Sequence, residues 1–412
     1  MSQLNKEDFN ICIVGLGYVG LPLAARFASK HFNIVGYDLN ETRVKELKLN
    51  NDSNDDISVD NLTLLNKNAI ITSNIADIKN CNIYIVTVPT PINLDKTPNL
   101  KPLVAASELV GGIMKKNSIV IYESTVYPGV TDEVCTPILE KKSKLKFNKD
   151  FATGYSPERI VPGEKINTIE KITKVVSGSN KQALKKISFL YSSIIDAGIH
   201  EAPSIKVAEA AKVTENIQRD VNIALINEMH QLYSALNIDT HEVINAASTK
   251  WNFMKLKPGL VGGHCISIDP YYLMHKSKME GYEPTIMSAA RKLNDEMCSW
   301  VVKEFLNFCN QNNINSNSKV TIFGYTFKEN CSDTRNTRVL DVIDILQKLN
   351  FRVNLWDPLI LDSDKEMLKS RNVEILDKPS IHKVIFLCVY HDEILEYLQN
   401  YNGFVYDYRK LS

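Results

Sequence analysis

One cysteine stands in a loop whose composition suggests chemistry. Residues 258–273 hold Cys265 among three glycines and two prolines, with His264 beside it and Asp269 four residues later. Glycines permit unusual backbone angles and the close approach of a ligand. A free cysteine is usually a buried, inert thiol, and that alternative stays open here. The turn-rich setting nevertheless makes Cys265 a candidate nucleophile.

A second candidate group lies on a long helix predicted at residues 204–236. Lys212, Asn216 and Arg219 are spaced i, i+4 and i+7, so they share one side of this helix, apart from its apolar face. Such a row is either a solvated polar face or a ridge of donors for an anion or a sugar, and the sequence leaves both open. Another long helix is predicted at residues 285–309.

The elements that could position a cofactor are clearest near the N-terminus. An apolar strand at residues 10–15 precedes Gly15-Leu16-Gly17-Tyr18-Val19-Gly20, a helical pattern at 21–30 and a strand at 32–37. The three glycines allow a tight turn, approach to a pyrophosphate and close packing of helix on strand. Asp38 ends the second strand, where a carboxylate binds ribose hydroxyls and repels a 2′-phosphate. The pattern predicts NAD rather than NADP.

Two further strands end in small hydroxyl residues. The strand at residues 83–88 leads to Thr90, and the strand at 118–122 leads to Thr125. Carboxyl ends of parallel strands face the ligand crevice in a doubly wound sheet, so both threonines are candidates for the cofactor or the reacting centre. A purely structural hydroxyl in a turn is an equally open interpretation.

The last third of the chain repeats the strand and helix order. Its predicted elements are strand 319–324, helix 337–350 and strands 352–356, 384–389 and 404–407. The turn at Gly324 lacks the second and third glycines, so the unit is Rossmann-like but not suited to a second dinucleotide. Lys328, Arg335 and Arg338 crowd this turn, where they would suit nucleotide phosphates or form a solvated basic surface.

Composition narrows the class of protein. The 412 residues include 48 Lys and Arg against 48 Asp and Glu, which gives no electrostatic reason to expect nucleic acid or a membrane as partner. The N-terminus does not look like a signal peptide, and no apolar run reaches a membrane-spanning length. Eight cysteines without C-x-x-C pairs predict reduced thiols in the cytoplasm. No His, Cys and Asp cluster has metal-ligand spacing, so no metal is expected.

These elements predict an α/β protein with two Rossmann-like, doubly wound domains joined by a central long-helix domain. The expected boundaries are residues 1–200 for the NAD-binding domain, 201–310 for the helical domain with the cysteine loop, and 311–412 for a second nucleotide domain. Two long helices between sheet domains suggest an oligomer interface, so a homodimer or higher homo-oligomer is expected.

Seven ordered motifs resemble the UDP-glucose/GDP-mannose dehydrogenase family along essentially the whole chain. They are Gly15–Gly20 with Asp38, Val88–Pro91, Glu123–Gly129, Ser156–Arg159, Lys212 with Asn216, Gly262–Cys265 with Asp269, and Phe327-Lys328 through Asp333-Thr334-Arg335. The run at residues 156–163 and Thr249–Phe253 look like UDP-N-acetylhexosamine (GlcNAc or GalNAc) 6-dehydrogenases of surface polysaccharide synthesis. UDP-glucose members have a second glutamate where this chain has Pro162, and this departure weakens the interpretation as a UDP-glucose dehydrogenase. UDP-glucose and UDP-ManNAc are the alternative substrates.

The resemblance implies a four-electron, NAD-dependent oxidation of the sugar C6 hydroxyl to a carboxylate, for capsule or O-antigen precursors. It implies that Asp269 acts as base through a water and that Cys265 forms a thiohemiacetal and then a thioester. Lys212 and Asn216 would stabilise the negative oxygen. Glu158, Thr125 and Asp269 would hold the hydrolytic water.

The binding residues follow from the same resemblance. Those expected at NAD are Gly15, Gly17, Tyr18, Val19, Gly20, Asp38, Arg43, Thr90, Thr125 and Arg335. Those expected at the UDP-sugar are Arg159, Ile160, Val161, Lys212, Asn216, Arg219, Lys250, Gly262, Phe327 and Lys328.

Two other classes of function share parts of this pattern. A two-electron NAD hydroxyacid dehydrogenase has the same N-terminal fold and helical middle, but it has no use for Cys265 or a second nucleotide domain. A non-catalytic nucleotide-sugar sensor would not need Cys265, Lys212, Asn216 and Asp269 together. Two NADH per substrate, one, or none would separate the three.

Overall fold

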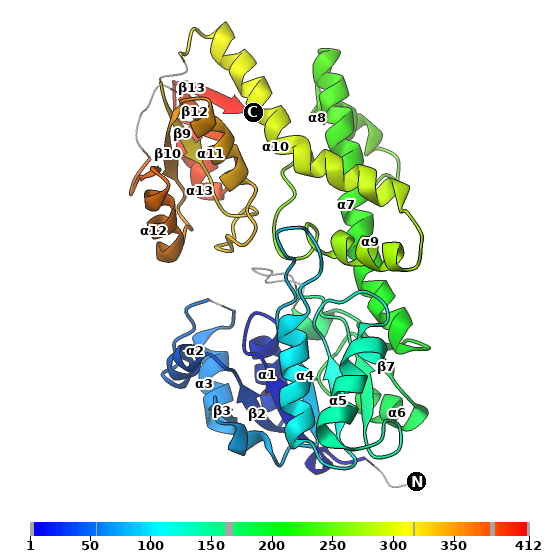
Figure 1. Cartoon of the computed structure of the whole chain (residues 1–412). Helices are drawn as coiled ribbons and strands as arrows, with labels where there is room; N and C mark the ends of the chain where they lie inside the picture. Colours follow the sequence, from blue (N-terminus) through cyan, green and yellow to red (C-terminus); the bar gives the residue numbers. More distant parts are fainter. Residues whose placement is uncertain (1–3, 55, 161–167, 316–317, 380–383, 410–412) are drawn as a thin grey trace. The chain divides into compact units, whose positions relative to one another are not determined.

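The computed structural model describes residues 4–54, 56–160, 168–315, 318–379 and 384–409. The chain forms two compact units, residues 1–215 with 271–280 and residues 216–270 with 281–412. Each unit contains a β-sheet with helices packed against it (Figure 1). The predicted α/β class, with two Rossmann-like sheets and long helices, is confirmed. The three domain boundaries stay a prediction.

The first unit is built on a sheet of eight strands, counted over the described residues, in the order β3-β2-β1-β4-β5-β6-β7-β8. Neighbouring strands are parallel, except that β6 and β7 are antiparallel. The strands are β1 (Asn10–Val14), β2 (Asn33–Tyr37), β3 (Ala69–Thr72), β4 (Ile83–Val86), β5 (Ile119–Tyr122), β6 (Ala152–Tyr155), β7 (Lys174–Gly178) and β8 (Ile199–Glu201).

Helices cover this sheet because its central strands are apolar on both faces. All four residues of β4 and of β5 are buried, which is typical of a parallel strand between two helix layers. The helices are α1 (Gly20–Ser29), α2 (Glu41–Lys48), α3 (Val59–Asn68), α4 (Lys101–Ile113), α5 (Thr136–Ser143) and α6 (Lys181–Ser192). Shorter helical turns span Lys6–Asp8, Ile75–Ile78, Thr131–Cys135 and Ile169–Lys171.

The second unit has a parallel sheet of five strands, again counted over the described residues, in the order β11-β10-β9-β12-β13. The elements are β9 (Lys319–Phe323), α11 (Val339–Lys348), β10 (Arg352–Trp356), α12 (Asp362–Ser370), β11 (Glu374–Ile375), β12 (Val384–Leu387), α13 (Asp392–Leu398) and β13 (Phe404–Asp407). This repeats the order of the first five strands of the chain, so both units are Rossmann-like.

The long helices lie close to their predicted positions. They are α7 (Ile205–Ala235) and α10 (Thr285–Gln311), and the shorter α8 (Thr240–Ala247) and α9 (Asp269–Met279) lie between them in sequence. Met297, Val301 and Phe305 of α10 pack into the core of the second sheet. Within the described residues, we find no helix long and apolar enough to cross a membrane.

Candidate functional site

The glycine-rich turn leaves room for a pyrophosphate at the start of α1. Gly15 has φ +101°, a backbone angle that favours glycine, and its N–H donates to Tyr37 O at 2.8 Å. A Cβ on Gly20 would lie 1.9 Å from Gly15 O, so only glycine lets the helix start here. Nothing lies within 4 Å of a Cβ placed on Gly17, which leaves the space above its backbone open. The turn therefore fits the phosphates of a dinucleotide.

Asp38 and Arg43 shape the neighbouring edge. Asp38 accepts hydrogen bonds from Leu16 N–H and Asn40 N–H, both at 2.8 Å, which fix its carboxylate beside the turn. Arg43 is buried, and its Nε donates to Leu16 O at 3.2 Å. Its two terminal nitrogens pair with Asp52 at 2.6 Å and with Asp56 at 3.2 Å. The guanidinium is thus already neutralised by two acids and offers little compensation for a 2′-phosphate near Asp38.

We therefore expect strong discrimination against NADP⁺. The kcat/KM with NAD⁺ should exceed that with NADP⁺ by well over about tenfold, because Asp38 repels the 2′-phosphate. Asp38→Asn should narrow this ratio, mainly by losing activity with NAD⁺ and gaining some with NADP⁺. Steady-state NADH and NADPH formation measures both. Equal values for the unmodified protein would contradict this interpretation of the second strand.

Thr90 and Thr125 follow adjacent strands. The register places Val86 of β4 beside Tyr122 of β5, so the loops after these strands leave the same edge of the sheet. The Ser124 hydroxyl donates to Val88 O at 2.6 Å and links the two loops. Thr90 is buried, whereas Thr125 is partly exposed. This arrangement supports a role for Thr125 toward a ligand more than for Thr90.

Three buried ionisable side chains meet beyond β5 and β6. Lys174 Nζ lies 2.7 Å from Glu123 Oε2 and 2.9 Å from Glu158 Oε2, and the Tyr191 hydroxyl also donates to Glu123. Burial raises the pKa of Glu123 to about 7, although Lys174 opposes it. Burial also acts on Glu158, but attraction to Lys174 and hydrogen bonds hold the pKa of Glu158 below its usual value. Glu158 is therefore a carboxylate at neutral pH.

Glu158 also fixes the backbone around it. Its Oε1 accepts from the N–H groups of Arg159 at 2.6 Å and Ile160 at 2.5 Å. Its main-chain oxygen accepts from Lys212 Nζ at 2.7 Å. Lys212 is 8% exposed, so it does not belong to a solvated polar face. Lys174 and Glu123 thus hold the segment that binds the Lys212 ammonium, and sequence reasoning assigned no role to either residue.

A further buried acid on α7, Glu209, holds the segment after Thr125. Its carboxylate accepts from Gly129 N–H at 2.6 Å and from Thr131 N–H at 2.9 Å, and it is fully buried. Burial raises the pKa of Glu209 to about 7, because the backbone donors offset only part of the lost hydration. Sequence reasoning missed Glu209, although it lies one helical turn before Lys212.

Glu209 should make stability depend on pH. The folded protein keeps its proton until about pH 7, whereas an unfolded glutamate releases it near pH 4.5. The unfolded state therefore binds fewer protons between these values, and the free energy of unfolding falls as pH rises through this window, by about 3 kcal/mol from this group. We expect Glu209→Gln to flatten this fall in denaturant titrations, unlike the exposed Glu283→Gln. If the free energy of unfolding fell equally with pH in the unsubstituted protein and in both variants, the role of Glu209 would be contradicted.

The cysteine loop belongs to the second unit. Cys265 is half-buried, whereas the other seven cysteines are buried, and all eight are free thiols. Its carbonyl accepts from Asp269 N–H at 2.9 Å, at the start of α9. Burial lowers the pKa of His264, and the nearby Arg335 lowers it further. His264 is therefore neutral at pH 7 and does not supply a cation to its neighbour Cys265.

Glycines let this loop lie on the turn after β9. A Cβ on Gly263, at φ +83°, would lie 2.8 Å from the Phe327 ring, and a Cβ on Gly262 would lie 2.7 Å from Asn336 O. Asn336 also donates to Gly263 O at 3.2 Å. The sequence attributed these glycines to unusual backbone angles and to ligand approach. Gly263 has such an angle, and both glycines make room for the chain itself. The expected ligand contact of Gly262 stays a prediction.

Asn216 and Asp269 also meet in the second unit. Asn216 Nδ2 donates to Asp269 Oδ2 at 2.5 Å, and both side chains are buried. Arg219, partly exposed, donates to Asn216 Oδ1 at 3.4 Å. The predicted base and one predicted oxyanion donor are therefore direct neighbours.

The remaining predicted residues are divided between the units. Arg159 pairs with Glu215 at 3.0 Å, and Tyr18 and Val19 lie at the start of α1. In the second unit, Lys250 is exposed, Phe327 and Lys328 are partly buried, and Arg335 pairs with Asp333 at 2.5 Å. Arg338 pairs with Asp341 and donates to Asp295 O. Val161 lies outside the described residues.

The fold and these groups define a nucleotide-dependent dehydrogenase with a cysteine loop. Three family models match in order: the NAD binding domain (residues 9–195), central domain (206–296) and UDP binding domain (321–411) of the UDP-glucose/GDP-mannose dehydrogenase family. The chain belongs to this family. It is an NAD-dependent nucleotide-sugar 6-dehydrogenase with a UDP binding domain.

Similar proteins cover almost the whole chain. A UDP-N-acetyl-D-glucosamine 6-dehydrogenase of Pseudomonas aeruginosa is 48% identical over 94% of this chain and 92% of that protein. Protein CapL of Staphylococcus aureus is 47% identical over 97% of this chain and 93% of its own. The structure of a UDP-D-ManNAc dehydrogenase from Pyrococcus horikoshii superposes with a TM-score of 0.82 at 28% identity, covering 95% of this chain and 91% of that one.

Proposed function

We propose that this protein oxidises the C6 hydroxyl of a UDP-N-acetylhexosamine, UDP-GlcNAc in the first place, to the uronate for capsule or O-antigen precursors. The observation that carries the proposal is the 48% identity to the UDP-N-acetyl-D-glucosamine 6-dehydrogenase of Pseudomonas aeruginosa over 94% of the chain. UDP-ManNAc is the second candidate, supported by the 28% identical Pyrococcus horikoshii structure. UDP-glucose is a weaker alternative because Pro162 replaces the second glutamate.

The chemistry assigns a role to each group. NAD⁺, when bound, supplies the acceptor for two electrons in each of two oxidations. Asp269 takes the C6 hydroxyl proton through a water, and Asn216 orients its carboxylate. Cys265 adds to the aldehyde to give a thiohemiacetal, whose oxidation gives a thioester. Lys212 and Asn216 stabilise the negative oxygen of these species.

Hydrolysis of the thioester completes the reaction. Thr125, Glu158 and Asp269 are proposed to position the attacking water. For Glu158, three protein donors already bind its two carboxylate oxygens, so its first effect is to fix the surrounding backbone and, through its carbonyl, Lys212. Lys250, Phe327, Lys328, Arg159 and Arg219 are proposed to hold the UDP-sugar, and Arg335 to reach NAD.

An NADH-release assay over a panel of UDP-sugars tests the substrate. We expect UDP-GlcNAc or UDP-GalNAc to give two NADH per sugar, with UDP-ManNAc and UDP-glucose slower. One NADH per substrate would indicate a two-electron dehydrogenase instead, and none with any sugar would indicate a sensor. As a check on the same samples, mass spectrometry should show a product about 14 mass units heavier than the substrate, because CH₂OH has become COOH.

A homodimer through the exposed side of α7 is part of the proposal. Leu225 and Leu232 are 48% and 55% exposed, and their spacing places them along one stripe of α7. Leu236, 55% exposed, directly follows the helix. Light scattering should give twice the chain mass, and Leu232→Glu should shift it toward the monomer. A monomeric unsubstituted protein would contradict the proposed homodimer.

The eight free thiols support the expected cytoplasmic location.

A further inference from the structure

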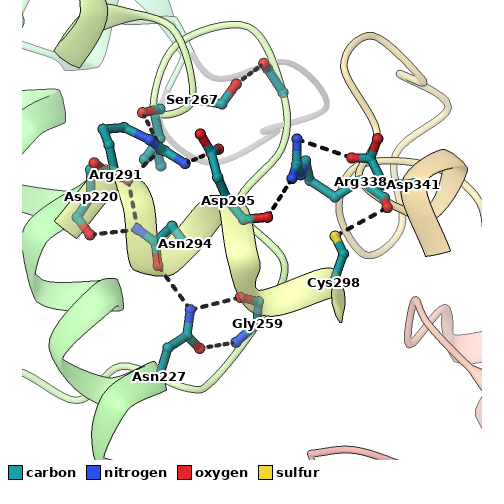
Figure 2. A network of polar contacts seen from close by, with 12 residues as sticks. Asp220, Asn227, Gly259, Ser267, Arg291, Asn294, Asp295, Cys298, Arg338 and Asp341 are labelled. Carbon is teal, nitrogen blue, oxygen red and sulfur yellow. Dashed lines mark hydrogen bonds and ion pairs between the residues drawn. The ribbon is translucent and has the colours of Figure 1, made fainter. Parts of the chain in front are cut away.

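A network of buried polar side chains joins α7 and α10 in the second unit (Figure 2). Asp220 Oδ1 accepts from Arg291 at 2.6 Å and from Asn294 at 2.8 Å. Asn294 Oδ1 in turn accepts from Asn227 at 2.9 Å. These four side chains are at most 2% exposed, so their hydrogen bonds are made within the protein.

The network ends on main-chain atoms of the cysteine loop. Asn227 makes two hydrogen bonds with the main chain of Gly259. Its Nδ2 donates to Gly259 O at 3.0 Å, and its Oδ1 accepts from Gly259 N–H at 2.9 Å. Arg291 donates to Ile266 O at 3.5 Å, directly after Cys265. The loop is thus held six residues before its cysteine and one residue after it.

A third contact follows the same side of α7. At about 100° per residue, positions 216, 220 and 227 fall within about 40° of one another on a regular helix. Asn216 binds Asp269, whose N–H binds the Cys265 carbonyl. One stripe of α7 therefore reaches the cysteine loop at Gly259, through Arg291 at Ile266, and at Asp269.

The chemistry of the loop explains why rigidity there matters. Addition of a thiol to an aldehyde requires the sulfur at near-attack distance, and an error of about 1 Å can cost about 10²-fold in rate. Two helices could pack with apolar side chains alone, yet these positions carry two amides, an acid and an arginine. Two of these side chains, Asn227 and Arg291, also bind the loop. Helix packing alone does not account for the two hydrogen bonds between Asn227 and Gly259.

We propose that Asn227 and Arg291 are positioning residues for Cys265, which hold its loop for the thiol-dependent half of the proposed oxidation. In this role they act through the loop and not on the substrate. The proposal rests on the proposed function only for its kinetic test, since the reactivity of Cys265 can be measured without a sugar.

Alkylation by iodoacetamide tests the positioning directly. Asn227→Leu removes both hydrogen bonds to Gly259. We expect Cys265 to be alkylated at least about fivefold faster in this variant, because its loop opens locally. Peptide mass spectrometry reports the other seven, buried cysteines in the same sample, and their rates should not change. Asn307→Leu, the same substitution at an exposed position of α10, is the matched control.

Turnover gives the second readout. Asn227→Leu should lower kcat by about 10²-fold with less than about threefold change in KM for the UDP-sugar, and stopped-flow traces should retain the first NADH while delaying the second. Arg291→Lys keeps a positive charge beside Asp220 but loses the reach to Ile266, so a smaller effect of the same kind is expected. If Asn227→Leu does not fold, the same two measurements on Arg291→Lys test the proposal.

The results separate the two proposals. Inactivity of the unmodified protein with every UDP-sugar would overturn the proposed function but leave the alkylation result to stand. An active protein whose folded variants show unchanged Cys265 alkylation and an unchanged second NADH phase would overturn the positioning role. Faster alkylation of all eight cysteines would show general loosening and would also overturn it.

Discussion

Cys265→Ala is expected to stop the four-electron oxidation. The first hydride can leave an ordinary alcohol, but a bare aldehyde has no hydroxyl-bearing tetrahedral carbon from which a second hydride can leave. Addition of the Cys265 thiol creates that carbon, and the resulting thioester is reactive enough to hydrolyse. Alanine removes the nucleophile, so at most one NADH per sugar and no covalent intermediate should form. In the unsubstituted protein, acid quench and peptide mapping should find the substrate adduct on Cys265 if hydrolysis of the thioester is slow.

The controls separate chemistry from stability. Cys265→Ser should also block net turnover, although slow oxidation through an aldehyde hydrate or an ester to serine is compatible with the mechanism. Cys309→Ala removes a buried thiol of α10 and should keep two NADH per sugar, with at most some loss of stability. If Cys265→Ala still makes two NADH per sugar at a near-normal rate, the thioester mechanism does not operate here.

The fold was predictable where its elements carry local signals. β1, the glycine-rich turn, α1 and β2 lie within one or two residues of prediction, because apolar strands, glycines and helical periodicity all occur there in a short stretch. β7 and β8 were not predicted. β7 begins with the buried Lys174 and β8 contains two charged or polar residues, so neither has an uninterrupted apolar pattern. The burial of Lys174 depends on its ion pairs with Glu123 and Glu158, and β8, which is partly or fully exposed, is a strand through its pairing with β7. Neither cause is visible in the local sequence.

The candidate site was predictable at its motifs but not in its supports. The spacing of Lys212 and Asn216 was visible, but only the structure shows that both are buried. Glu209, Asp220 and Asn227 lie on the same helix, and each looks in sequence like an ordinary solvated residue. Glu209 and Asn227 bind main-chain atoms of distant loops, and Asp220 binds side chains of α10. No local pattern encodes such contacts.

The apolar face predicted for α7 was only partly right. Three apolar residues of this helix, Val207, Leu225 and Leu232, are 46%, 48% and 55% exposed. The helix instead buries a polar stripe, because acids and amides there satisfy the backbone of the loops around it. Hydrophobic periodicity finds which side of a helix is apolar, but it does not tell whether the polar side faces solvent or the site.

Lys212→Ala is expected to lower kcat by about 10²–10³-fold with a much smaller effect on KM, the size typical of losing one oxyanion donor. The ammonium is held at 2.7 Å from the Glu158 carbonyl and is 8% exposed, so it is oriented before any substrate arrives. Lys206→Ala, an exposed lysine on the same helix that pairs with Glu133, is the matched control and should keep normal turnover. Removal of Lys212 also leaves a carbonyl without its donor, so the midpoint of thermal unfolding must be measured beside kcat. A folded Lys212→Ala with near-normal kcat and a raised KM would make Lys212 a substrate anchor and would assign the stabilisation of negative oxygen to Asn216 alone.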